Sequence, residues 1–503
     1  MINNTLKGIA EMKEKYISPL PRNHKLAQIF LNLRSFFLTK LFMWLCFAAG
    51  ALFISFGAEV FGVVFFVLLI ALIMTVSDDI LPTTFPFLVI CISVLQCYNS
   101  FSTFIKLWWL AIPVVAAVVF HFVFYRRPVV IGRTFYGIVA VTVAVTVGGL
   151  GFISIENYFK SMYYVAGLGV GMLICYILIK SQMEIDRDYD WREKFVDIMY
   201  MAGLFTCFQL IAVYVENYIS LSDRLTLLEF LEKREIIGEQ RLGMTEYYPS
   251  TIAPNTIMLQ CGNNISTFIM MFLPFPFYKA MKSNRSLWHL ITPLFMMVIV
   301  FFSGSRGGLL MGGAEFLICL VAFAVMTRHK LSKYIGWAIV AVAFCAAAVL
   351  AFKLGLVAKL ATMLMHAEDE VRGKLFSLSI REFVESPIFG KGIANPAVSQ
   401  FYSGKTGTMG WYHMMLPQII GSMGIVGIAG YGFQIFTRVR EVIKRFNSFV
   451  MILGLSYLGV FLMTQVNPGE FCPLPYEMMV VMLFVLIEKE PERVKNKKIK
   501  GDI

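Results

Sequence analysis

Long apolar runs recur along the whole sequence and constrain its fold more than any other feature. Read against the charged residues between them, they give fourteen candidate spans, because about 20 apolar residues cross a bilayer as a helix. With 58% hydrophobic and 15% charged residues, against about 25% charged in soluble domains, we expect an all-α polytopic membrane protein. The expected number of transmembrane helices is about 12–14, and this composition excludes a nucleic-acid-binding protein despite a net charge of +12.

The candidate spans are expected at residues 38–56, 60–76, 82–98, 108–125, 134–155, 162–179, 195–215, 254–278, 287–303, 307–326, 334–352, 414–436, 446–466 and 477–487. Lys and Arg accumulate in cytoplasmic loops, and placing the N-terminus inside puts 30 of the 44 in the inner loops and both terminal segments. The short outer loops then hold only Lys106, Lys160 and Arg306. Both termini are therefore predicted to be cytoplasmic, and membrane topology accounts for most of the basic excess.

Two long segments on the outside organise the rest of the chain. The first, 216–253, is predicted to contain a surface helix, and the second is the extracytoplasmic loop 353–413. Within this loop, residues 371–386 are expected to form a helix that ends before Pro387, because the residue before a proline resists helix. Its apolar side chains predict that it lies on the bilayer surface. Long loops of this kind are usually functional or disordered.

Topology leaves few groups on the outer face for chemistry. Of six histidines, only His366 and His413 are expected outside. His366 lies in a polar stretch and is expected to be solvated. His413 stands where the long loop re-enters the membrane. A lone histidine is more often structural, but this position makes His413 a candidate general base, since its unperturbed pKa is near 6.5.

Two arginines are candidates for binding an anion. Arg306 stands in SGSRGGLL, a tight turn between two spans, and the planar guanidinium binds phosphate oxygens with two hydrogen bonds. Snorkelling of Arg306 to lipid headgroups is the structural alternative. Arg241 precedes the point where the chain re-enters the membrane. The further candidates for substrate contact are Asn255, Ser305, Arg372, Trp411 and Tyr412. The two aromatic rings are equally well explained as interfacial anchors.

Other patterns give no metal or cofactor site. Asp186 and Asp188 are spaced like a metal-binding pair, but they are expected in a solvated cytoplasmic loop. The acidic run 368–370 precedes a helix, where acids favour the N-terminus. The nine cysteines show no CxxC spacing, so neither a metal knuckle nor a disulfide framework is indicated. Glu315 is an acid within a span, a position that is functional by default, and no role is assigned to it.

Several of these residues resemble the O-antigen ligase and polymerase family of integral-membrane glycosyltransferases. Arg306 to Leu310 is similar to an Arg-x-x-x-Leu element of the ligases. His413, followed nine residues after Met414 by Gly424, Gly427 and Gly430, resembles the second ligase motif. Met414 departs from the polar residue of that motif. RLGMTEYYPSTIAPN resembles a third element, which makes Arg241 its arginine, and FVESPIFGKGIANP resembles a fourth. The resemblance covers roughly residues 240–430.

The resemblance implies a GT-C-like glycosyltransferase that is independent of metal and inverts the transferred sugar. Its donor would be an undecaprenyl-diphosphate-linked oligosaccharide, its acceptor a glycan hydroxyl, and its site would face outward from the cytoplasmic (inner) membrane. Arg241 and Arg306 would stabilise the leaving diphosphate, and His413 would take the acceptor proton. The chain is then expected to divide into a cytoplasmic segment 1–37, N-terminal spans 38–239, a catalytic region 240–436 that includes the loop 353–413, C-terminal spans 437–487 and a basic tail 488–503.

Three functions remain open at this point. We expect a polymerase that elongates a lipid-linked repeat unit of a cell-envelope polysaccharide, such as a capsule or exopolysaccharide. The second hypothesis is a ligase that moves the glycan to a terminal acceptor such as lipid A core. The third is a transporter or flippase, which predicts charges lining a midplane pathway. The expected partners are membrane lipid, a flippase and a chain-length regulator, with no nucleic acid.

Overall fold

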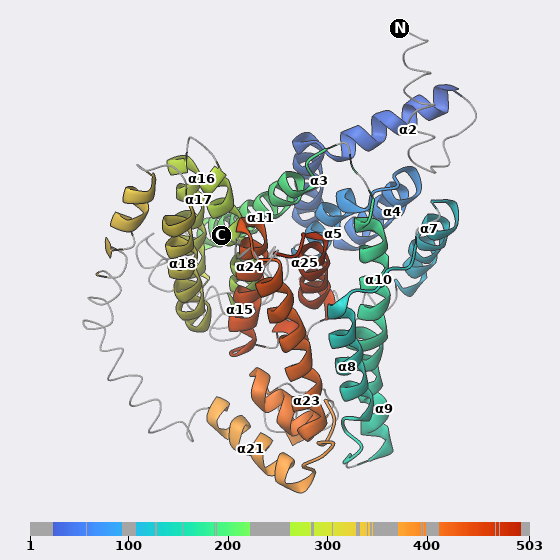
Figure 1. The fold of residues 1–503 in the computed structure, drawn as a ribbon, viewed down its shortest axis with the longest axis vertical. Coiled ribbons are helices and arrows are strands. Elements are labelled where there is room, and N and C mark those ends of the chain that lie inside the picture. The colour runs from blue at the N-terminus through green and yellow to red at the C-terminus, as the bar shows by residue number, and fades with distance from the viewer. Residues whose placement is uncertain are drawn as a thin grey trace, which may run out of the picture. The chain divides into compact units, whose positions relative to one another are not determined.

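The computed structural model describes residues 24–92, 107–221, 262–327, 332–345, 371–398 and 412–493, apart from short breaks within these ranges. This described part is built from helices and contains no strand (Figure 1). The all-α architecture expected from the sequence is therefore confirmed. The chain forms two compact units, the first of residues 1–130 and 178–344 and the second of residues 131–177 and 345–503.

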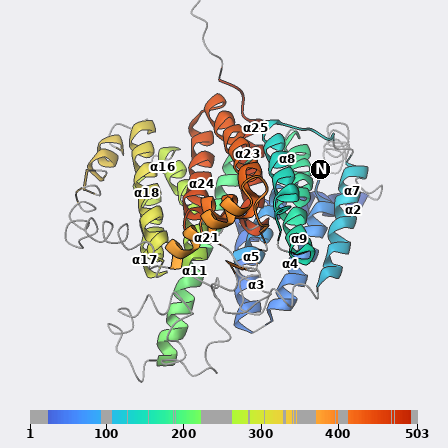
Figure 2. The same ribbon diagram turned by 90° about the horizontal axis from the view of Figure 1, so that it is seen from below.

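The first unit contains the helices that precede α8 (Arg133–Val147) and those from α11 to α18. Its helices are α2 (His24–Phe37), α3 (Lys40–Ser55), α4 (Glu59–Val76), η1 (Leu81–Thr83), α5 (Thr84–Ile92), η3 (Trp108–Leu110), α7 (Ala111–Phe124), α11 (Trp191–Leu221), α15 (Gly262–Phe272), α16 (Pro274–Lys282), α17 (Ser286–Phe302) and α18 (Arg306–Met326). In both views α16, α17 and α18 lie side by side (Figures 1 and 2).

The second unit is organised around one long helix. Its helices are α8 (Arg133–Val147), α9 (Ile155–Tyr164), the π-helix η4 (Val165–Gly171), α21 (Val371–Glu385), α23 (Met415–Lys444), α24 (Ser448–Thr464), η6 (Gly469–Phe471), the π-helix η7 (Pro473–Glu477) and α25 (Met478–Lys489). Helix α10 (Met172–Met183) begins in this unit and ends in the first. Helices α8 and α21 pack against α23 (Figure 1).

The described residues contain fewer full-length spans than the sequence suggests for the whole chain. Within the described residues, helical segments 165–183, 191–212, 307–326 and 415–444 are long and apolar enough to cross a membrane. A fifth span results if the bent pair Gln28–Phe37 and Lys40–Ile54 is counted as one. Many of the 12–14 expected spans are shorter apolar helices, below the about 20 residues that cross a bilayer. The chain is nonetheless an integral membrane protein built from helices.

Local sequence explains where several helices begin. Thr39 accepts a hydrogen bond from Phe42 N at the start of α3, and Asn447 accepts bonds from Phe449 N and Val450 N at the start of α24. Such side chains satisfy amides that a helix leaves unpaired in its first turn. A predicted outer helix is also found, since α21 ends at Glu385, two residues before Pro387.

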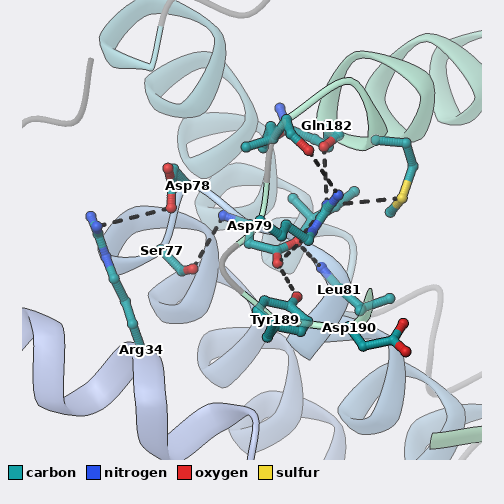
Figure 3. A network of polar contacts seen from close by, with 12 residues as sticks. Arg34, Ser77, Asp78, Asp79, Leu81, Gln182, Tyr189 and Asp190 are labelled. Carbon is teal, nitrogen blue, oxygen red and sulfur yellow. Dashed lines mark hydrogen bonds and ion pairs between the residues drawn. The ribbon is translucent and has the colours of Figure 1, made fainter. Parts of the chain in front are cut away.

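The loop predicted to be solvated around Asp186 and Asp188 instead carries a buried ion pair. Arg187 Nε and Nη2 donate to both carboxylate oxygens of Asp79 at 2.8 Å, and Tyr189 also donates to this carboxylate (Figure 3). Burial alone would raise the pKa of Asp79, but Arg187 outweighs it and holds that pKa below its ordinary value. Asp186 and Asp188 themselves lie outside the described residues. Through Arg187 and Tyr189, this loop therefore stabilises the turn between α4 and α5.

A second buried charge cluster lies within the second unit. Arg438, which the sequence places in a cytoplasmic loop, lies inside α23 with its side chain 2% exposed. It contacts Glu477 at 2.5 Å and Glu470 at 3.4 Å. Its guanidinium also lies 5.1 Å from the ring of Tyr457. A charge at this depth is costly unless it is paired, so these contacts hold α24 and the η6–η7 segment onto α23.

Candidate functional site

The turn that carries Arg306 is a close-packed, hydroxyl-rich corner of the first unit. Ser305 Oγ accepts from Gly308 N at 2.8 Å and donates to Asn263 Oδ1 at 2.5 Å, which caps α18 and ties it to α15. A Cβ at Gly308 would lie 2.1 Å from Ser266 Oγ, closer than non-bonded atoms approach. Arg306 is the first residue of α18, at the positive end of the helix dipole.

This geometry gives Ser305 a structural role, since its hydroxyl is engaged within the protein and the residue is 3% exposed. A contact of Ser305 with substrate stays a prediction. Sequence reasoning did not find Asn263, which is its partner. A polar residue at the start of an apolar run was the available signal. The side chain of Arg306 lies outside the described part, so its anion-binding role also stays a prediction.

His413 lies in the second unit, at the turn into α23. Its φ is 56°, and it is the non-glycine residue with positive φ in the described part of the chain. This region is uncommon for side-chain-bearing residues, although histidine is enriched in it. Two hydrogen bonds of the Gln418 side chain hold this turn. Its Oε1 accepts from Tyr412 N at 3.1 Å, and its Nε2 donates to Ser422 Oγ at 2.8 Å. The backbone at His413 is therefore held in one conformation.

Hydrogen bonds between the turn segment after α21 and a break in α23 support this turn. Residues 387–392 follow α21 and bond to residues 421–426 of α23, which we call the clasp. Its bonds are Lys391 N to Gly421 O, Gly392 N to Ser422 O, Ile425 N to Pro387 O and Val426 N to Ile388 O, between 2.9 and 3.2 Å. The backbone groups of α23 in this stretch can bond to residues 387–392 because Gly424 has non-helical angles, φ 60° and ψ −147°. The clasp fixes α21 relative to His413.

Glycines make the clasp possible. Gly390 and Gly424 both have positive φ, which suits glycine. A Cβ at Gly390 would lie 2.4 Å from Met423 N, and one at Gly424 would lie 2.5 Å from Pro387 O. Farther along α23, a Cβ at Gly430 would lie 2.7 Å from the Ala144 Cβ of α8. The motif glycines thus serve the close approach of backbones.

The turn after α8 also contributes to the clasp, although this part of the sequence carries no recognised motif. In the turn after α8, Gly149 N donates to Phe389 O at 2.6 Å, and a Cβ at Gly149 would lie 2.6 Å from Gly392 Cα. Lys391, between two positive-φ glycines, places its Nζ 3.2 Å from Glu385 Oε2. Sequence reasoning weighed only the outer arginines and missed this half-buried cation beside the clasp.

Tyr412 does not present its ring to a surface. It is 1% exposed and packs with Leu375 and Val398 beneath α21. On the opposite side of α21, Phe376, Ile380 and Val384 are exposed, which fits the expectation of a helix with an apolar face toward lipid. Tyr412 therefore supports α21, and the structure gives no support for its stacking on a sugar.

The remaining predicted residues are placed only in part. Arg241, Asn255 and Trp411 lie outside the described residues, and of Arg372 only its position in the first turn of α21 is described. Arg306 and His413 belong to different units. Within the described ranges, no group of three or more His, Cys, Asp or Glu side chains could hold a metal ion.

Residues 291–432 match the sequence profile of the O-antigen ligase family. Over this segment the chain is therefore similar to the O-antigen ligases. The matched segment begins within α17 and extends into α23, so it contains the Arg306 turn, α21, the clasp and His413. It starts later than the expected region at residue 240, and Arg241 and Asn255 lie before it. No curated protein matches the chain.

Among the described residues of the matched segment, Glu315 is a buried acid. Glu315 is fully buried in α18, nine positions after Arg306 on the same helix. Both of its carboxylate oxygens are without a hydrogen-bond partner among the described residues. A buried carboxylate within a span is costly, and we assign Glu315 no catalytic step.

Proposed function

We propose that the protein is a glycosyltransferase that polymerises repeat units of a cell-envelope polysaccharide. The donor in this proposal is an oligosaccharide linked to undecaprenyl diphosphate, and the acceptor is a hydroxyl of a second glycan. The observation that carries the proposal is the match to the O-antigen ligase family together with His413 fixed at a positive-φ turn by the clasp. Backbone conformations of this kind concentrate at functional sites.

The proposed reaction breaks the bond between the anomeric carbon of the donor sugar and a phosphate oxygen. The acceptor oxygen attacks that carbon from the opposite face, which forms the new glycosidic bond with inversion. His413 takes the proton of the attacking hydroxyl as general base. Arg241 and Arg306 stabilise the negative charge that develops on the leaving diphosphate. No step needs a metal ion, since the two guanidinium groups supply the positive charge.

A ligase is the second candidate, and the description of the matched family favours it. The same donor chemistry would then transfer a finished glycan to a terminal acceptor such as lipid A core. A transporter has less support. Its charges would face a pathway, whereas the side chains of Arg438, Glu470 and Glu477 are only 2–5% exposed and pair with one another.

The proposal places the protein in the cytoplasmic membrane with both termini inside. Its site then faces outward, where a flippase would deliver the lipid-linked donor and a chain-length regulator would limit the product. The exposed apolar side chains Phe376, Ile380 and Val384 of α21 support this arrangement, since they would rest on the outer bilayer surface beside the clasp.

The test is the glycan pattern of cells that carry His413→Ala in place of the wild type. We expect loss of the long-chain ladder and accumulation of single repeat units on lipid, with equal protein in the membrane. The matched control is His366→Ala, the other histidine expected outside, which should keep the ladder. Long chains that persist on lipid would support the ligase. An unchanged pattern would remove His413 from the mechanism.

A further inference from the structure

A polar cavity opens among four helix ends of the first unit. Its volume is about 370 Å³. It lies between the first turns of α3, α11 and α17 and the last turn of α16. Its charged and polar lining consists chiefly of Lys40, Glu193, Asp197, Lys279, Lys282 and His289. No step of the proposed reaction uses these groups.

Ion pairs build the floor of this cavity. Lys279 Nζ lies 2.8 Å from Asp197 Oδ1 and also contacts Glu193 Oε1. Only 15% of the Lys279 side chain is exposed. The two acids of α11 therefore hold this ammonium group in place. The residues are one helical turn apart on α11 and therefore present both carboxylates to α16.

Two further lysines stand at the rim with their charge largely unneutralised. Lys40 Nζ is 3.6 Å from Asp197 Oδ1, but its side chain is 64% exposed. Lys282 makes no ion pair to a described residue, and its Nζ lies 4.8 Å from the ring of Tyr278. Three lysines face two carboxylates across the cavity lining. The cavity therefore keeps a positive excess at its mouth, and an anion can meet both rim lysines.

The distribution of Lys and Arg predicts that the cavity lies on the cytoplasmic side of the membrane. Its helix ends border the segments 180–194 and 279–286, which the distribution of Lys and Arg places inside the cell. Trp191, the first residue of α11, carries the guanidinium of Arg192 over its ring at 5.5 Å. Tryptophan and arginine of this kind are typical of the headgroup level. A headgroup of the inner leaflet can therefore reach this cavity from the bilayer.

We propose that this cavity binds the phosphate of an anionic phospholipid headgroup in the inner leaflet. Lys40 and Lys282 contact the phosphate, while Lys279 supplies positive charge from the floor, held by its two acids. Basic pockets between transmembrane helices on the cytoplasmic side suit such headgroups. The acyl chains then lie along the apolar sides of the adjacent helices. The proposal is independent of the glycosyl transfer.

Binding is tested on the full chain purified in a neutral detergent. Phosphatidylglycerol, phosphatidylcholine and inorganic phosphate are each titrated, and the apparent affinity is taken from native mass spectrometry and from the rise in Tm. We expect phosphatidylglycerol to bind at least about tenfold more tightly than phosphatidylcholine, a difference of about 1.4 kcal/mol. Inorganic phosphate should protect weakly, since it lacks the acyl contacts.

The decisive variant is the double substitution Lys40→Gln and Lys282→Gln. Its charge-matched control is Arg440→Gln with Lys444→Gln, at the inner end of α23. We expect the first pair to lose phosphatidylglycerol affinity by about tenfold, because charge-assisted contacts are lost, and the control to keep it. A single Lys282→Arg variant preserves the charge and should retain most of the affinity. Its binding shows that substitution at this position does not by itself unfold the site.

The outcomes separate the sources of phosphate. Equal protection by inorganic phosphate and by phosphatidylglycerol would overturn the lipid assignment in favour of a soluble phosphate ligand. Equal binding of phosphatidylglycerol by the two double variants would overturn the site itself. Lipid preference that is lost only with Lys40 and Lys282 would support the proposal.

Discussion

Gly424→Ala is the substitution that tests most sharply how the clasp holds the His413 turn. Gly424 breaks α23 with φ 60° and ψ −147°, a combination that residues with a side chain rarely adopt. A Cβ there would lie 2.5 Å from Pro387 O and 2.7 Å from Ile388 C. Both obstacles are backbone atoms, which cannot rotate away as a side chain can. The variant must therefore shift residues 387–392 or α23 itself.

Two contributions determine how much Gly424→Ala should lower the free energy of unfolding. Backbone strain at a sparsely populated φ/ψ costs about 1–3 kcal/mol, and overpacking adds about 1–3 kcal/mol. Together these make about 2–6 kcal/mol, a large share of the about 5–15 kcal/mol that stabilises a typical protein. Gly432 on the same helix is the matched control. A Cβ at Gly432 meets nothing within 4 Å, and alanine in an exposed helix gains about 1 kcal/mol over glycine.

Two measurements check this prediction. Thermal unfolding in detergent should show a clear fall in Tm for Gly424→Ala and no fall for Gly432→Ala. The cellular glycan ladder should be lost in the first variant and kept in the second, at matched membrane levels. Equal Tm and equal ladders for the two alanine variants would refute the argument that the clasp needs glycine at position 424.

Gly308→Ala should disturb the Arg306 turn, since its Cβ would lie 2.1 Å from Ser266 Oγ, and reduce glycan transfer; Gly313→Ala, whose Cβ meets nothing within 4 Å, should not, and equal transfer would contradict this. Arg306→Lys should keep its membrane level but lose most transfer, because an ammonium group is not a planar fork; unimpaired transfer would return Arg306 to a structural role. Asp79→Asn should lower stability at neutral pH by about 3–5 kcal/mol, since it leaves a buried guanidinium unpaired. Because the folded-state pKa of Asp79 is depressed, the Tm advantage of the wild type should be full above about pH 4 and shrink as the pH falls below it; an advantage that is unchanged at low pH would contradict the ion pair.

Local features of the sequence predicted much of the fold. The apolar runs indicated helices, and the helix before Pro387 was found as α21. The glycine spacing after His413 was recognised as a motif, yet its physical reason was not visible. Gly424 opens the helix to pair with residues 387–392, and such pairing depends on segments that are far apart in sequence.

Long-range contacts also explain what the sequence missed. Arg438 ends an apolar run and is typical of a cytoplasmic loop, but Glu470 and Glu477 fold back to meet it inside the unit. Arg187 was expected in a solvated loop, and only the approach of Asp79 makes it a buried partner. A charge near the end of an apolar run is ambiguous in sequence, because its partner decides whether it is buried.

The most direct test of the proposed function is glycan transfer by the purified protein with a lipid-diphosphate-linked donor and a glycan acceptor. The account predicts transfer with inverted anomeric configuration that survives EDTA, and a loss of about 10²–10⁴-fold in rate for His413→Gln, the range expected for a missing general base. Retention of configuration, a requirement for added magnesium, or an unimpaired His413→Gln variant would contradict it.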